Sequence, residues 1–167
     1  MIYILDTNFF IQAHRVNYPL DVVISFWNKF KDLSLGGDTL ISIDKVQNEL
    51  NHSTHPDQLA TWCAQNLPDG FFKDSSIAIN EYTKIVNWAV SHQTYNQNAK
   101  SEFLASGEAD AFLVAYALTD PSNFTLITHE VSNPYIKNRI KIPEVCDKFN
   151  IKYCNTIEMF RRLEQTF

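Results

Sequence analysis

Short apolar segments alternate with helical patterns along this chain, and this alternation constrains the fold more than any other sequence feature. Four segments are short, apolar and β-prone, and we expect them to be strands: Ile2–Leu5, Thr39–Ile43, Phe124–Thr128 and Ile151–Cys154. Between and after them, apolar residues recur at helical spacing, mainly in 21–35, 44–50, 57–67, 77–104, 108–118, 143–149 and 156–163. Strands separated by helices predict a parallel sheet with helices on both faces. We therefore expect an α/β fold, a three-layer α/β/α sandwich around a mainly parallel sheet of about four strands.

Length and composition favour a single domain over residues 1–167. Of the 167 residues 45% are hydrophobic, which is enough for a sizeable core, and no Pro-, Gly- or Ser-rich linker divides the chain. The longest uninterrupted apolar run, 111–118, is far shorter than the roughly 20 residues that a membrane-spanning helix needs. The first residues contain no basic side chain ahead of their apolar stretch. We therefore expect no signal peptide, no membrane association and a cytoplasmic location.

Charge and cysteine content exclude several kinds of site. With 14 basic and 19 acidic residues the net charge is −5, which argues against holding nucleic acid by bulk positive charge. An enzyme whose acids are metal ligands is still compatible with this charge. The three cysteines include no C-x-x-C pair, so we expect neither a disulfide framework nor a zinc–thiolate site.

Acidic residues follow the predicted strands at the sheet edge where the chemistry of parallel sheets gathers. Asp6 follows the first strand directly, and Glu130 comes two residues after the third. Glu49 lies one helix after the second strand, at the edge of the apolar stripe that contains Val46 and Leu50. Each acid also has a purely structural interpretation: Asp6 as a helix N-cap, Glu49 as a solvent-facing rim residue, and Glu130 as a loop acid.

Asp110 is the acid that a structural role explains least well. It stands three residues before Leu113 and four before Val114, on one face of an apolar helix. The helix dipole stabilises an acid in the first turn by only about 0.3–1 kcal/mol, whereas burying it unpaired costs several kcal/mol. A site role is therefore favoured for Asp110. Glu108, in the same turn, fits either the site or an ordinary N-terminal acid.

Four acids at one edge would repel one another unless cations neutralised them. Mg²⁺ and Mn²⁺ suit carboxylate oxygens combined with bound water. The sequence therefore predicts a Mg²⁺ or Mn²⁺ site at this edge, and a metal-loaded acidic pocket attracts phosphate even on an acidic protein.

The segments that carry these acids resemble the motifs of PIN-domain ribonucleases, which include the VapC-like toxins of bacterial toxin–antitoxin pairs. IYILDTN (2–8) is similar to their first motif, VQNEL (46–50) to their second, and EADAFLVAYA (108–117) to their third. LITHE (126–130) stands where their fourth motif falls, and the order and spacing agree over nearly the whole chain. The chain departs from the pattern in having Glu at position 130, where Asp or Asn is usual, and in its long segment 54–106.

The resemblance implies a metal-dependent endoribonuclease that hydrolyses RNA phosphodiester bonds and is the toxin of a toxin–antitoxin pair. It implies Mg²⁺ or Mn²⁺ as cofactor, RNA as substrate, a cognate antitoxin as protein partner, and a homodimer as one oligomeric state. The catalytic and metal-binding residues that it implies are Asp6, Glu49, Asp110 and Glu130. The supporting residues are Thr7, Asn8, Glu108 and Thr128.

A basic strip follows the fourth motif. Lys137, Arg139 and Lys141 alternate there, and they would place positive charge beside the acids for contacts with the RNA backbone. A solvated loop is the alternative interpretation. His52 and His55 are three residues apart but lie in a polar break over 51–56, which favours an exposed loop over a metal site.

Three other functions fit parts of the pattern. A phosphatase of the haloacid dehalogenase type also begins with a strand and an Asp, but it needs a second Asp where this chain has Asn8. Dinucleotide binding lacks its Gly-rich turn after the first strand. The more serious alternative is a catalytically inactive PIN-like scaffold that binds RNA or a protein, which the Glu at position 130 keeps open. A metal titration with a matched nuclease assay separates the scaffold from the nuclease.

Overall fold

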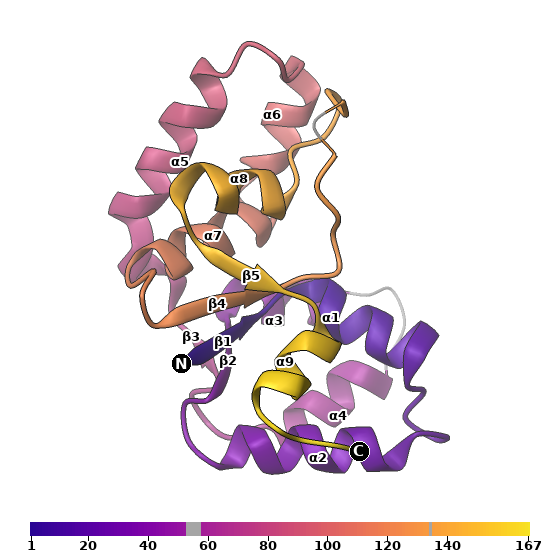
Figure 1. Cartoon of the computed structure of the whole chain (residues 1–167). Helices are drawn as coiled ribbons and strands as arrows, with labels where there is room; N and C mark the ends of the chain where they lie inside the picture. The colour runs from indigo at the N-terminus through magenta and orange to yellow at the C-terminus, as the bar shows by residue number, and fades with distance from the viewer. Residues whose placement is uncertain (53–57, 134) are drawn as a thin grey trace.

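Five short strands form a parallel sheet at the centre of the computed structural model, which describes residues 1–52, 58–133 and 135–167 (Figure 1). The strands are β1 (Ile2–Leu5), β2 (Leu40–Ile43), β3 (Phe72–Lys73), β4 (Phe124–Ile127) and β5 (Lys152–Cys154). They lie in the order β3-β2-β1-β4-β5, and each neighbouring pair is parallel. The predicted α/β class and parallel sheet are confirmed, with one strand more than expected.

The unexpected strand, β3, is only two residues long. It pairs with β2 at the edge of the sheet, where Phe72 lies opposite Ser42 and Lys73 opposite Ile43. Two residues are too few to show the alternation that identifies a strand in a sequence. Packing against the core holds this edge in place, since the Phe72 ring lies 6.3 Å from that of Phe10.

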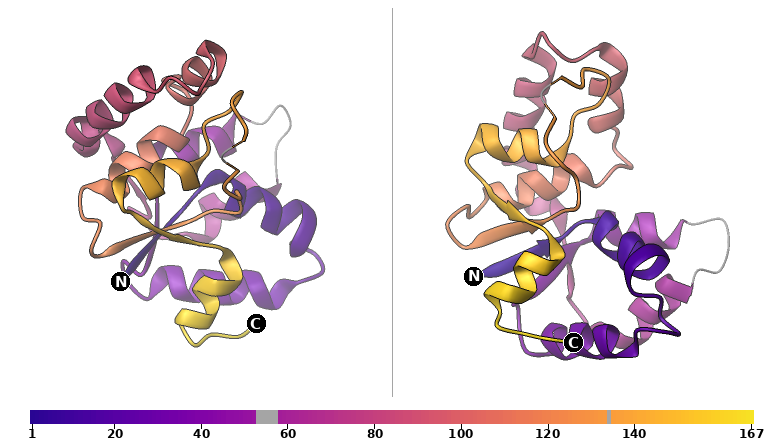
Figure 2. Two further views of the ribbon diagram at one scale, coloured as in Figure 1. Left: turned by 45° about the horizontal axis from the view of Figure 1, so that its top comes forward. Right: turned by 45° about the vertical axis from the view of Figure 1, so that its right-hand side comes forward.

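Helices cover both faces of the sheet, as predicted. Their bounds are α1 (Thr7–Gln12), α2 (Ile24–Leu35), α3 (Asp44–Asn51), α4 (Gln58–Asn66), α5 (Ile79–Ser91), α6 (Gln97–Phe103), α7 (Asp110–Leu118), α8 (Ile142–Phe149) and α9 (Thr156–Arg162). A π-helical turn (Ala13–Asn17) follows α1, and a 3₁₀ turn (Ser75–Ala78) precedes α5. Figure 1 shows α2, α4 and α9 on one side of the sheet and α5 to α8 on the other, and the turned views of Figure 2 agree. Within the described ranges, no helix has the length and apolar character needed to cross a membrane.

The predicted helical stretch 77–104 is two helices rather than one. The chain leaves the helical conformation at His92, with ψ at 119°, and resumes it after Asn96. The Asn96 side chain caps α6 by accepting a hydrogen bond from the Ala99 N–H at 2.8 Å. The break coincides with the polar residues of this stretch. The polar break predicted for 51–56 includes His55. Most of this break lies within 53–57, which are outside the described residues.

Aromatic packing fixes α1 on the sheet. Phe9 and Phe10 are fully buried, and their ring centroids lie 5.2 Å apart in an edge-to-face arrangement. Phe9 also lies 5.2 Å from Phe30 of α2. Burial of one such side chain contributes about 1.5–3 kcal/mol. Asp6, which follows β1 directly and caps α1, is therefore held in one position relative to the sheet.

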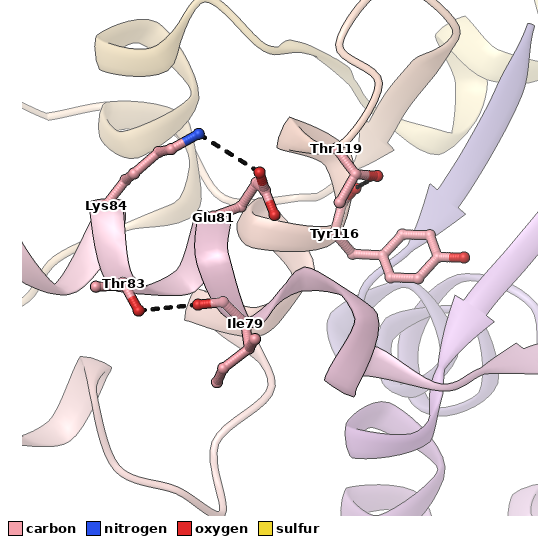
Figure 3. A network of polar contacts seen from close by, with 6 residues as sticks. All are labelled: Ile79, Glu81, Thr83, Lys84, Tyr116 and Thr119. Carbon is pink, nitrogen blue, oxygen red and sulfur yellow. Dashed lines mark hydrogen bonds and ion pairs between the residues drawn. The ribbon is translucent and has the colours of Figure 1, made fainter.

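Helix α7 has different surroundings at its two ends. Its C-terminal end packs beside α5, among local contacts that Figure 3 shows. Side chains there bond within their own helices: Thr119 to the Tyr116 carbonyl (2.7 Å), Thr83 to the Ile79 carbonyl (2.9 Å), and Lys84 to Glu81 (3.4 Å). A surface ion pair such as that of Lys84 with Glu81 stabilises a fold little. The other end of α7 begins with Asp110 and points toward the carboxyl end of the sheet.

Candidate active site

The candidate site lies at the carboxyl end of the two central strands. β1 and β4 are neighbours, and Leu5 pairs with Ile127 where both strands end. From β1 the chain continues to β2 on one side, whereas from β4 it continues to β5 on the other. α/β sheets usually bind their ligands at the carboxyl ends of the strands where such a reversal of direction occurs. Asp6 and Thr128 are the first residues after β1 and β4, so both lie at this edge of the sheet.

Asp6 has one carboxylate oxygen bonded and the other without a partner. Its Oδ1 accepts a hydrogen bond from the Phe9 N–H at 2.6 Å, which confirms the N-cap interpretation. The side chain is fully buried, and its Oδ2 has no hydrogen-bond partner in the part of the chain that the structure describes. Burial raises the pKa of Asp6 to about 8, although the Thr128 hydroxyl and the Phe9 N–H act in the opposite direction. A buried, unpartnered carboxylate oxygen is costly unless it gains a proton or a cation.

Asp110 begins α7 and is partly buried. The pKa of Asp110 is raised to about 7, mainly by burial and also by the charges of Glu130 and Glu49, while the charge of Arg139 acts in the opposite direction. The charges of Asp110 and Glu130 in turn raise the pKa of Asp6. Charges interact this way only over short distances, because salt screens them within about 10 Å. The structure thus gathers the four predicted acids in one region.

Glu49 uses both of its carboxylate oxygens within the protein. The Thr7 hydroxyl donates to Oε2, and the Ala109 N–H donates to Oε1 at 2.7 Å. Burial raises the pKa of Glu49, and these two donors lower it. Thr7 follows Asp6, and Ala109 precedes Asp110. From α3, Glu49 therefore connects the two segments that carry the aspartates.

The carboxylate of Glu130 is also occupied by protein groups. The Arg139 guanidinium forms an ion pair with Oε1 at 3.0 Å, and the Ile142 N–H donates to Oε2 at 2.8 Å. The Glu130 side chain is only 8% exposed. Thr128 supports the turn that carries it, because its hydroxyl oxygen accepts from the Glu130 N–H at 3.1 Å.

A hollow of about 30 Å³ adjoins Asp110. Its lining includes Asp110, Arg139, the predicted Glu108 and also Glu102, which the sequence did not single out. Glu102 belongs to α6, and the sequence pattern could not show that this helix folds back to the acids. The hollow has room for a water molecule or a small cation. The remaining predicted residue, Asn8, lies in α1 and is partly buried.

The three predicted RNA contacts differ in their surroundings. Arg139 lies at the acids, where it pairs with Glu130 and lines the hollow. The Lys141 ammonium donates to the Val131 carbonyl at 2.7 Å. Lys137 is exposed. The basic strip therefore brings one cation, Arg139, to the predicted site.

The carboxylates do not form a complete metal cage as they are placed. In residues 1–52, 58–133 and 135–167, no three or more His, Cys, Asp or Glu side chains are arranged to hold a metal ion. Glu49 and Glu130 already have protein partners for both oxygens. Asp6 and Asp110 do fit a hard cation, since both are oxygen donors and the Asp6 Oδ2 lacks a partner. Two carboxylates with several retained waters are a common arrangement for Mg²⁺.

Comparisons with known proteins agree with this architecture. A family model described as "Domain of unknown function (DUF4411)" matches residues 3–167. Among solved structures, the "Crystal structure of VapBC2 from Rickettsia felis bound to a DNA fragment from their promoter" is similar, with a TM-score of 0.51 and 18% sequence identity. The alignment covers 93% of this chain and 98% of that chain. A comparison with curated proteins produced no match. At this identity the likeness shows the fold, and the chain has a PIN-like fold, as predicted.

Proposed function

The chain belongs to the DUF4411 family, and we propose that it is a metal-dependent endoribonuclease that hydrolyses RNA phosphodiester bonds. One observation carries the proposal: the buried Asp6 has an oxygen without a partner among the described residues, and it lies near enough to Asp110 for that charge to raise its pKa. The motif resemblance implies the same chemistry, and the PIN-like fold is consistent with that resemblance.

The two aspartates are the residues that would hold Mg²⁺ or Mn²⁺. When bound, the cation lowers the pKa of the attacking water and supplies positive charge for the phosphoryl oxygens. The Phe9 N–H fixes Oδ1 of Asp6, and Oδ2 is the oxygen that lacks a partner among the described residues. Glu49 keeps the two aspartates at a constant separation through Thr7 and Ala109. Mutation of residues that hold metal ligands in place typically lowers metal affinity or activity 10- to 100-fold.

The test is cleavage of a mixed set of short structured RNAs with Mg²⁺, Mn²⁺ or EDTA. Asp110→Asn, purified identically, controls for contaminating nucleases, and the exposed Asp21→Asn controls for a generic loss of one acid. We expect cleavage by the wild type and Asp21→Asn that needs the metal, and none by Asp110→Asn. Equal cleavage by Asp110→Asn and wild type would exclude the proposed site.

A toxin role is the finer part of the proposal. Its support is the structural likeness to VapBC2, together with the motif resemblance. Expression in a bacterial host should stop growth for the wild type and not for Asp110→Asn, and co-expression of a cognate antitoxin should restore growth. Normal growth with wild-type protein that cleaves RNA in vitro would remove the toxin role and keep the nuclease.

A catalytically inactive scaffold that binds RNA or a protein is the second candidate. It is favoured by the occupied oxygens of Glu49 and Glu130 and by the lack, among the described residues, of three gathered metal-ligating side chains. Calorimetric titration with Mn²⁺ separates the two functions. A scaffold shows neither Mn²⁺ binding nor cleavage, whereas the nuclease shows both.

A further inference from the structure

The ion pair between Glu130 and Arg139 joins two residues to which the sequence assigns separate tasks. The resemblance makes Glu130 a metal ligand, and the basic strip makes Arg139 one of three equivalent RNA contacts. In the structure the two side chains meet at 3.0 Å, near enough to Asp110 for both of their charges to act on its pKa. Each residue therefore constrains what the other can do.

Glu130 is poorly placed to act as a metal ligand. Its second oxygen accepts the Ile142 N–H at 2.8 Å, at the residue where α8 begins. Turning this carboxylate toward a cation would break that bond and separate the Arg139 pair, in a side chain that is 8% exposed. A buried N–H left without an acceptor is costly. The guanidinium beside it also offsets part of the negative charge of Glu130.

Arg139 is well placed to meet a phosphate. Its side chain is 51% exposed while it is paired, and a guanidinium carries five N–H donors in a rigid plane. It lines the same hollow as Asp110, and its charge lowers the pKa of Asp110. Arginine matches the geometry of phosphate oxygens better than lysine does. An arginine held on one side by a carboxylate keeps its remaining donors in a fixed orientation.

We infer that Arg139 binds a non-bridging phosphate oxygen of the RNA at the candidate site, and that Glu130 positions this guanidinium instead of ligating the metal. The inference rests on the proposed function. It separates the roles of three of the four acids: Asp6 and Asp110 would hold the cation, while Glu130 acts through Arg139. It also removes one negative charge from the surface that the phosphate approaches.

The test uses Arg139→Gln, Glu130→Gln and the double variant, with Lys84→Gln as a control for an exposed cation outside the strip. Calorimetry measures Mn²⁺ binding without any need for cleavage, and steady-state kinetics gives KM and kcat with an RNA substrate. Circular dichroism verifies folding. Arg139→Gln keeps the bond between Glu130 and Ile142, so it retains the fold even where Glu130→Gln does not.

We expect Arg139→Gln to raise KM by about tenfold or more, the range of a lost charge-assisted hydrogen bond. Lys84→Gln should change KM less than about threefold, as exposed charges do. The double variant should have the KM of Arg139→Gln, because Glu130 acts only through the arginine, and it should bind Mn²⁺ within about threefold of Arg139→Gln. Arg139→Lys should recover KM only in part.

Two results would overturn the inference. Mn²⁺ binding more than about tenfold weaker in the double variant than in Arg139→Gln would make Glu130 a metal ligand. An unchanged KM in Arg139→Gln would remove the phosphate contact. Failure of the proposed function looks different, because the wild type itself would then neither bind Mn²⁺ nor cleave RNA.

Discussion

Replacing Asp6 by Asn should stabilise the metal-free protein at pH 8 and not at pH 4.5. Burial raises the pKa of Asp6 to about 8, whereas an unfolded chain has the ordinary value of 3.8. Between these values the folded state holds a proton that the unfolded state releases, so stability falls as the pH rises from about 4 to about 8. At 1.36 kcal/mol for each pKa unit, the ionisable group lowers the free energy of unfolding at pH 8 by about 5 kcal/mol.

Asparagine does not ionise, so Asp6→Asn removes this pH dependence of stability at a smaller free-energy cost. Its side-chain oxygen still accepts the Phe9 N–H, but its amide N–H₂ occupies the position of Oδ2, which has no described partner. An unsatisfied buried donor costs about 1–3 kcal/mol. The expected net gain for Asp6→Asn is therefore about 2–4 kcal/mol at pH 8, with no gain at pH 4.5, where the wild type is protonated.

Urea unfolding in EDTA, followed by circular dichroism at pH 4.5, 6 and 8, measures these differences. Asp21→Asn, at an exposed position, should follow the wild type at every pH. If Asp6→Asn were less stable than the wild type at pH 8, or if the difference did not change with pH, the reasoning from burial would be refuted.

Three further predictions follow from the same contacts. Mn²⁺ at 100 times its dissociation constant should raise the free energy of unfolding by about 2.7 kcal/mol in the wild type and not in Asp110→Asn, as measured by urea unfolding at pH 7.5; equal shifts would place the metal elsewhere. Glu49→Ala should lower stability by about 1–3 kcal/mol through the loss of two hydrogen bonds, and it should weaken Mn²⁺ binding. Glu49→Gln keeps an acceptor for the Ala109 N–H, so it should lose less stability and less Mn²⁺ affinity. Weaker Mn²⁺ binding by Glu49→Gln than by Glu49→Ala would contradict a positioning role. Asn96→Ala should cost about 1 kcal/mol by uncapping α6, and Mn²⁺ affinity measured by calorimetry should not change.

The sequence predicts this fold well because its main signals are local. A buried strand such as Ile2–Leu5 is a continuous apolar run, and a helix such as α3 shows its period in Val46 and Leu50, which are four residues apart and both buried. Alternation of the two kinds of element then indicates the parallel sheet without any knowledge of contacts. The strand β3 was missed for the same reason, since its two residues carry no local pattern and pair only because β2 leaves an edge beside them.

The site is predictable only as far as topology places residues. The sequence predicts that Asp6 and Asp110 lie close together, because Asp6 follows a strand and Asp110 begins a helix beside the same edge of the sheet. The partners of Glu49 could not be foreseen, because Thr7 lies 42 residues away and Ala109 lies 60 residues away. The pairing of Glu130 with Arg139 depends on how the chain turns between β4 and α8, and residue identity alone does not specify that turn.

The double use of Asp6 has a consequence for how this protein can change over evolution. One oxygen of its side chain caps α1, and the other lacks a partner among the described residues. Asn, Ser and Thr are also good capping residues, so a single replacement can remove the negative charge and leave the helix intact. If the proposed activity holds, its loss at this position need not pass through an unstable intermediate. A descendant without the proposed chemistry would keep the fold, and selection could then retain it for binding alone.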